Sequence, residues 1–67
     1  MCPITAKKLI KILEENGFIL SRQKGSHQIY KNREVAVTVP IHGKNKPIHI
    51  GTLIAIIKQS KIPKEKF

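Results

Sequence analysis

Apolar residues near the start of the chain recur at the spacing of one helix face, with lysines and glutamates on the other face. They are Ala6, Leu9, Ile10 and Leu13. Thr5 is a suitable N-cap, although no glutamate or glutamine follows at the position that would complete a capping box. Asn16-Gly17 supplies the stop, with Gly17 at the left-handed position that favours glycine. The pattern predicts a helix over residues 5–16.

Three short segments follow in which apolar and polar residues alternate, as is typical of half-buried strands. We predict strands at residues 18–24, 27–31 and 35–39. Gly25 and Ser26 suit a tight turn between the first two strands, and residues 32–34 form the second turn. Pro40 ends the third strand.

Residues 41–49 contain Gly, Asn, Pro and Lys and are predicted to form a loop. A second helix is predicted over residues 50–60. Its apolar residues extend beyond a single face: Ile50, Leu53, Ile54, Ala55, Ile56 and Ile57. A helix that is apolar on more than one side is either sandwiched in a core or presents the excess to a partner. After Pro63 we expect a short turn that folds Phe67 back.

The order helix–strand–strand–strand–helix predicts an α+β fold. Sequential strands joined by tight turns form an antiparallel sheet, and two helices then cover one face and leave the other open to a ligand. With 67 residues the chain has room for one domain, over residues 1–67. A domain of this size has a thin core and commonly depends on a partner.

The charge of the chain narrows the class of partner. Thirteen Lys and Arg residues against four Asp and Glu residues give a net charge of +9, which favours polyanions such as nucleic acid or an acidic protein. The single cysteine, Cys2, excludes an intrachain disulfide, and with no evident leader it is consistent with a cytoplasmic protein. The longest apolar run, residues 53–57, is too short to span a bilayer, so no membrane role is expected.

His27 directly follows the Gly25-Ser26 turn, which does not need it. On frequency alone, a single histidine at the start of a strand is structural. Its neighbours favour chemistry, because Arg22, Lys24 and further cations flank it and would draw phosphate towards it. An imidazole can exchange a proton near neutral pH, and RNA carries its own nucleophile in the 2′-hydroxyl. One histidine with lysine and arginine is therefore enough to cleave RNA without a metal.

The three histidines make a weak metal-binding set. His27, His42 and His49 include no pair at i, i+2 or i, i+4, and no pair of thiolates helps them. We therefore expect no metal and no other cofactor. His42, just before Gly43, is either a second candidate acid or base or a loop residue, and we favour the loop.

Four segments of the chain are similar to one known family. They are LIKILEENGF, RQKGSHQIY, VTVPIHGKNKPI and GTLIAIIKQSKI, and in this order they cover nearly the whole chain. The chain resembles the HicA (YcfA-like) family of bacterial mRNA-interferase toxins. Gly-Ser-His alone is a short signal, but its position between NGF and VTVP, with GTL following, makes the match specific.

The resemblance implies a double-stranded-RNA-binding-domain-like fold and cleavage of RNA by His27, without a metal. It also implies a HicB-like antitoxin that covers the site, and contact with operon DNA only through that antitoxin. Two positions depart from the family. Gln28 stands where a second histidine or another polar residue is frequent, and Ile54 replaces a common arginine.

Both lines of reasoning converge on one candidate site. His27 is expected to be the general acid/base, and Ile29 and Ile54 are expected to meet the antitoxin. The expected RNA-binding residues are Arg22, Lys24, Gly25, Ser26, Lys44 and Lys46. Tyr30 can stack on a base or pack in the core, and strand alternation favours packing, with Ile29 beside His27 on the open face.

Two other functions stay open at the level of sequence. The chain can be a non-catalytic RNA-binding module of the double-stranded-RNA-binding type, which grips RNA without cleaving it. It can also be a protein-interaction subunit that docks through residues 50–60 and has no affinity for RNA. Cleavage products with 2′,3′-cyclic phosphate or 5′-hydroxyl ends separate the first of these from the toxin hypothesis.

Overall fold

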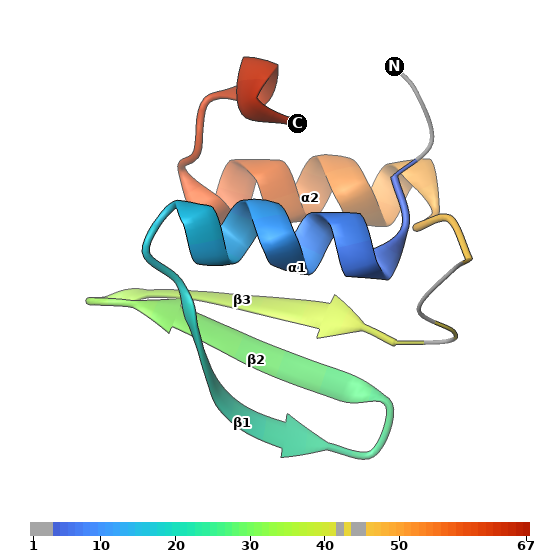
Figure 1. Ribbon diagram of the computed structural model, residues 1–67, viewed down its shortest axis with the longest axis horizontal. Coiled ribbons are helices and arrows are strands. Elements are labelled where there is room, and N and C mark those ends of the chain that lie inside the picture. The colour runs from blue at the N-terminus through green and yellow to red at the C-terminus, as the bar shows by residue number, and fades with distance from the viewer. Residues whose placement is uncertain (1–3, 42, 44–45) are drawn as a thin grey trace.

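The predicted order of helices and strands is present in the computed structural model, which describes residues 4–41, 43 and 46–67 (Figure 1). The elements are α1 (Ala6–Glu15), β1 (Ile19–Lys24), β2 (His27–Asn32), β3 (Val35–Pro40), α2 (Ile50–Ser60) and a short 3-10 helix, η1 (Lys64–Lys66). Every predicted helix and strand is confirmed, and no boundary differs by more than one residue. The α+β class is therefore correct.

The ends of α1 are set by side chains that the sequence pattern identifies. Thr5 Oγ1 accepts a hydrogen bond from the Lys8 amide at 3.2 Å, which is the expected N-cap. Gly17 has φ of +89°, and a Cβ there would lie 3.1 Å from the side-chain nitrogen of Asn32. That Asn32 nitrogen donates to the Asn16 carbonyl at 3.1 Å and so ties β2 to the end of α1. Glycine is favoured at position 17 by its positive φ, and a Cβ there would also crowd the Asn32 side chain.

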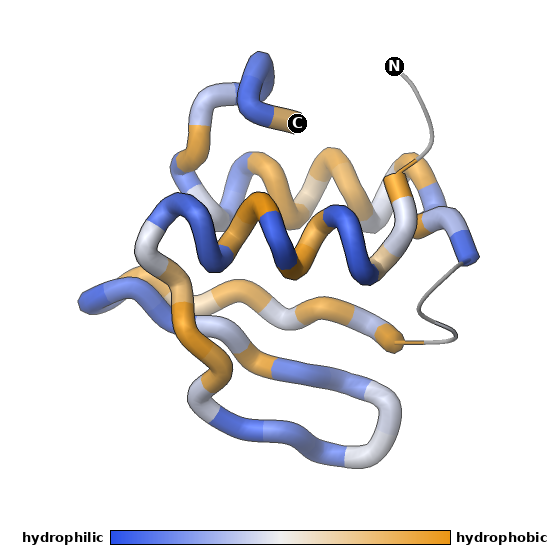
Figure 2. The backbone as a smooth tube through the Cα atoms, in the orientation of Figure 1, coloured by the Kyte–Doolittle hydropathy of each residue, from blue (hydrophilic) through white to orange (hydrophobic). Residues whose placement is uncertain are grey.

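The core lies between the two helices and the side of the sheet that faces them, with β3 nearest the helices (Figure 1). The buried core residues are Ile4, Leu9, Leu13, Phe18, Tyr30, Val37, Val39, Leu53, Ile56 and Ile62. Hydrophobic colour in Figure 2 accordingly follows β3 and much of α2, whereas the strand segments on either side of the pale β1–β2 turn are hydrophilic. Phe67 packs against this core from the C-terminal turn, which confirms the expected fold-back.

The helices do not cover the whole sheet, which differs from the simple two-layer expectation. The sheet is antiparallel with strand order β1-β2-β3, and all six residues of β1 are exposed. Leu20 faces the helix side in register with Tyr30, yet 48% of its surface is accessible. Beyond Ile19 and Leu20 the strand is polar, so it has no apolar face to bury against a helix. The β1–β2 hairpin therefore projects past the layer of helices.

Candidate active site

The candidate site lies on the sheet face that points away from the helices, here called the open face. Residues paired across antiparallel strands share a face. The register pairs His27 with both Lys24 and Pro40, and it pairs Ile29 with both Arg22 and Thr38. Lys31 follows on the same face by alternation. His27, Arg22, Lys24 and Lys31 are exposed there, whereas the four acidic residues of the chain are Glu14, Glu15, Glu34 and Glu65, outside the three strands.

A β-bulge in β1 decides which side chains join His27. The pairing runs from Leu20↔Tyr30 directly to Arg22↔Ile29, so Ser21 is an extra residue on β1. Strict alternation would put Leu20 and Arg22 on the same face. The extra residue separates them, which leaves Leu20 on the helix side and sends Arg22 to the open face. Bulges next to active sites commonly redirect a side chain in this way.

The turn before His27 explains part of the Gly-Ser-His sequence. Lys24 pairs with His27, so Gly25 and Ser26 form a two-residue hairpin loop. Gly25 has φ of +58°, which fits the first central position of a type II′ turn, and a Cβ there would meet nothing within 4 Å. Glycine is therefore required by backbone conformation and not by lack of space. The Ser26 carbonyl accepts from the Ile41 amide at 2.6 Å, which ties the turn to the segment after β3.

A cavity of about 450 Å³ opens at the end of the sheet where β2 begins and β3 ends. The sheet contributes His27, Thr38 and Pro40, all from the open face. The opposite wall includes Lys46, His49 and Thr52, from the loop and the first turn of α2. His27 and His49, which are far apart in the sequence, therefore line the same cavity.

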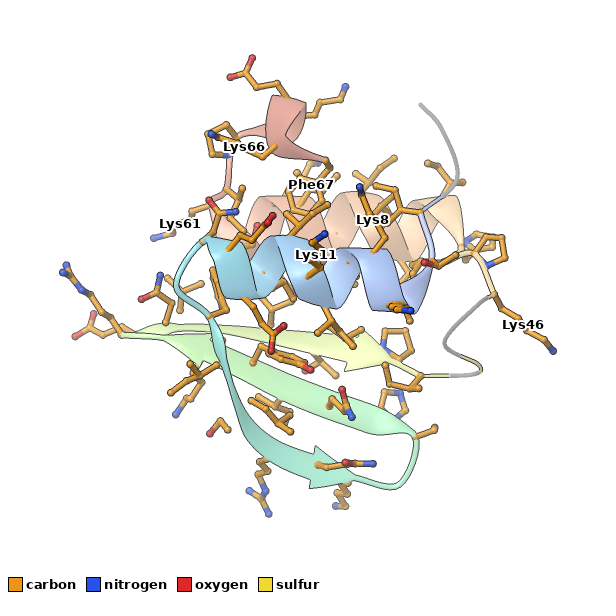
Figure 3. All side chains as sticks on the ribbon, viewed as in Figure 1. Lys8, Lys11, Lys46, Lys61, Lys66 and Phe67 are labelled. Carbon is orange, nitrogen blue, oxygen red and sulfur yellow. The ribbon has the colours of Figure 1, made fainter. Side chains whose placement is uncertain are left out.

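Lys46 forms part of the rim of this cavity. A Cβ on Gly43, which has φ of +144°, would lie 3.3 Å from the aliphatic stem of Lys46, and the Lys46 amide donates to the Gly43 carbonyl at 3.1 Å. Figure 3 shows the Lys46 side chain extending outward from the loop, away from the helices and sheet. The stem therefore packs along the rim while the ammonium group reaches into solvent, as lysines commonly do.

The predicted site residues do not all belong to this cavity. Arg22 and Lys24 share the open face with His27, and Gly25 and Ser26 form the adjoining turn. Lys44, like His42, lies outside the described residues.

The two predicted partner residues lie on different surfaces. Ile29 is half-buried on the open face, whereas Ile54 is 42% exposed on α2 beside Ile57, Lys58 and Lys64. Ile54 is one of the apolar residues of α2 that lie outside the buried side of the helix. Neither isoleucine lines the cavity next to His27.

Tyr30 and Gln28 face the helices and not the site. Tyr30 retains 3% exposure, so packing is confirmed and stacking on a base is excluded. Its hydroxyl donates to Gln28 Oε1 at 3.0 Å. Burial, with a smaller contribution from the negative charge of Glu14, raises the pKa of Tyr30 above its usual 10.0.

Sequence reasoning did not predict that His49, Thr38 and Thr52 line one cavity with His27. His49 directly precedes the predicted second helix, so its place at a helix start could have been read from the sequence. Its place in the same cavity as His27 could not, because that depends on how α2 lies against the end of β3.

The described residues form neither a metal centre nor a membrane-spanning helix. No group of three or more His, Cys, Asp or Glu side chains is arranged there to hold a metal ion. In the same part of the chain, no helix has the length and apolar character needed to cross a bilayer.

Comparison with known proteins gives the family. A family model described as the HicA toxin of bacterial toxin–antitoxin systems matches residues 6–62, a span that runs from the first residue of α1 to just past α2 and includes Gly25, Ser26 and His27. No curated protein matches the chain. The chain therefore belongs to the HicA toxin family of bacterial toxin–antitoxin systems, and this implies an antitoxin as its partner.

Proposed function

We propose that this toxin is a metal-independent endoribonuclease, an mRNA interferase, with His27 as its general acid/base. A HicB-like antitoxin neutralises it. The observation that carries the proposal is the position of His27, whose exposed ring lies where the cationic open face meets the cavity. A histidine sealed in the core could not meet a polynucleotide, and this one is not sealed.

The chemistry needs few groups because RNA supplies the nucleophile. The 2′-oxygen forms a bond to phosphorus while the bond from phosphorus to the 5′-oxygen breaks, which leaves a 2′,3′-cyclic phosphate and a 5′-hydroxyl. One proton leaves the 2′-hydroxyl and one joins the departing 5′-oxygen. His27 transfers one of these protons, and water exchanges the other. DNA lacks the 2′-hydroxyl, so the mechanism selects RNA.

The cations of the open face hold the substrate. Arg22 and Lys24 lie on β1 next to His27, and their positive charges attract the backbone and offset charge on the phosphorane. Lys46 offers a further phosphate contact at the opposite rim, and Lys44 is expected to act with it. Gly25 and Ser26 keep the approach to His27 free of bulk, because the turn has open space above the glycine.

The antitoxin acts by covering this face. Ile29 stands among cations on the open face, where an apolar side chain gains nothing from solvent. A HicB-like protein seated over His27 would bury Ile29 and exclude RNA at the same time. The toxin then meets DNA only through the antitoxin, and both act in the cytoplasm, where mRNA is present.

Replacing His27 with Ala tests the proposal. We expect the rate of RNA cleavage in EDTA to fall by about 100-fold to 10,000-fold, since general acid–base catalysis contributes that much. Growth arrest on expression should disappear as well. Lys66→Ala, which removes a cation from η1 outside the strands and the cavity, is the control and should cleave normally. A His27→Ala variant as toxic as the parent would overturn the proposal.

The non-catalytic RNA-binding module is the second candidate, and the one-sided charge of the open face favours it over a protein-only role. It predicts tight binding that weakens with salt, is unchanged by His27→Ala, and yields no cleavage products. Detection of cyclic-phosphate or 5′-hydroxyl ends with the parent protein, and their loss with His27→Ala, selects the nuclease.

A further inference from the structure

A second imidazole lines the same cavity as His27. His49 stands immediately before α2 and faces this space together with Thr52. Its ring is therefore available to anything that fills the cavity from the open face.

The backbone on both sides of His49 is held in place. The Ile48 amide donates to the Ile4 carbonyl at 2.7 Å, which fastens the end of the loop to the segment before α1. The His49 carbonyl accepts the first helical hydrogen bond of α2, from the Leu53 amide at 2.9 Å. The imidazole therefore projects from a fixed point of the wall.

One hydrogen bond determines what the ring can do. His49 Nδ1 accepts from the Gly51 amide at 3.2 Å, so His49 is the N-cap of α2. A neutral imidazole carries one N–H, and an accepting Nδ1 leaves that hydrogen on Nε2. Nε2, the free nitrogen of the ring, is therefore a hydrogen-bond donor. The lone pair of Nδ1 is already used to accept from the Gly51 amide.

Histidine is not one of the residues preferred at this position, where Ser, Thr, Asp or Asn caps a helix with fewer atoms. The imidazole adds a donor nitrogen on the far side of the ring, which capping does not use. The residue that carries this extra donor lines the same cavity as His27.

We propose that the Nε2–H of His49 donates a hydrogen bond to a phosphate oxygen of RNA bound in the cavity, and that His49 takes no part in proton transfer. This inference rests on the proposed ribonuclease function. The two imidazoles then have different roles. His27 transfers a proton, whereas His49 stays in its Nε2–H tautomer and binds the phosphate. Lys46 at the rim attracts the phosphate by its positive charge but does not fix the orientation of the phosphate.

The decisive variant is His49→Asn, since Asn caps helices well but has no donor at the reach of Nε2. We expect an unchanged melting temperature and a loss of about tenfold to a hundredfold in the single-turnover cleavage rate, the usual size for a hydrogen bond to a charged group. The shape of the pH–rate profile should stay that of the parent, because His27 still carries the proton. His49→Ser, a second good cap, should behave in the same way.

A spectroscopic readout does not depend on cleavage. Long-range ¹H–¹⁵N correlation in the free protein should show His49 as the Nε2–H tautomer, and an uncleavable 2′-O-methyl RNA oligonucleotide should shift its Nε2 resonance. The same oligonucleotide should leave the His49 Nδ1 resonance nearly unmoved, since that atom stays on the Gly51 amide.

The outcomes separate this inference from the proposed function. If His27→Ala abolishes cleavage while His49→Asn matches the parent, the role of His49 is wrong and the nuclease stands. Loss of one limb of the pH–rate profile in His49→Asn would also overturn it, by making His49 a proton carrier. An Nδ1–H tautomer would overturn it too, because Nδ1 could then not accept from the Gly51 amide. If His27→Ala cleaves as well as the parent, the proposed function itself fails.

Discussion

Successive side chains of β2 alternate between the candidate site on the open face and the side that packs against the helices. His27 and Ile29 face the open side, whereas Gln28 and Tyr30 face the helices and share a hydrogen bond. Gln28 also lies within 3.4 Å of Gln23 Oε1, so the helix side of the hairpin carries its own polar contacts. One face of β2 packs against the helices and the other carries the candidate site. The register must therefore be kept, because a shift of one residue would bury His27 and expose Tyr30.

Tyr30 provides a test of this arrangement, as it is the only tyrosine and the chain has no tryptophan. Burial raises its pKa above 10.0. In the unfolded chain the pKa returns to about 10. The unfolded state therefore loses its proton first, and stability should fall as the pH rises above 10, with no contribution from Tyr30 below that pH.

The ultraviolet absorbance of the tyrosinate measures this directly. Titration of the native protein should give a midpoint above that of the same protein in concentrated urea. Tyr30→Phe removes the signal and is the control for lysine deprotonation in the same range. Equal midpoints in the native and unfolded states would contradict the burial of this hydroxyl.

Single residues at element ends also shape the fold, and the end of α2 is the clearest case. Ser60 is buried, and its Oγ donates to the Ile57 carbonyl at 2.9 Å and accepts from the Ile62 amide at 3.2 Å. Between Ser60 and Ile62, Lys61 adopts a left-handed conformation with φ of +61°. This conformation normally belongs to glycine, and a residue with a Cβ pays strain to adopt it.

Lys61→Gly should therefore stabilise the protein relative to Lys61→Ala by about 1 kcal/mol in the free energy of unfolding. Both variants remove the same charge, so their difference isolates the backbone conformation. Urea denaturation followed by circular dichroism measures it. If Lys61→Ala proves as stable as Lys61→Gly, the chain does not hold a left-handed residue at this position.

At the scale of the whole molecule, the half-buried Ile29 and the exposed Ile54 lie on different surfaces. Ile29 belongs to the open face next to His27, whereas Ile54 lies on α2, where Ile50 is also exposed. An antitoxin that touches both must wrap around the toxin. An antitoxin that touches one leaves the other in solvent.

We predict that Ile54→Asp and Ile29→Asp each weaken antitoxin binding by at least about tenfold, as expected for anchors in an interface core. Isothermal titration calorimetry with the purified antitoxin measures this. Ile54→Asp should keep the fold, because 42% of the Ile54 surface is already exposed. Leu20→Asp, on the uncovered helix side of β1, introduces the same charge and is the matched control.

Each of the three variants has its own contradicting outcome. If Ile54→Asp does not fold, Ile54 is a core residue and its role in partner binding is wrong. If Leu20→Asp weakens binding as much as the others, the effect comes from general charge and not from a defined surface. Normal binding by Ile29→Asp would show that the antitoxin does not neutralise the toxin by covering the open face.

The sequence by itself determined the elements, their order and the place of His27 at the start of a strand. These features depend on interactions between residues close in the sequence. They are the spacing of the apolar residues, the N-cap at Thr5, and the positive φ angles that favour glycine at positions 17 and 25. Strand alternation also separated Tyr30 from His27 correctly.

Only the tertiary structure decided the rest. The bulge at Ser21, which moves Arg22 to the face of His27, depends on pairing between two strands and leaves no local pattern. The exposure of β1 depends on where the helices pack. The cavity that His27 and His49 both line depends on how the start of α2 lies against the end of β3. Neighbouring residues set local conformation, but contacts between distant segments arise only when the whole chain has packed.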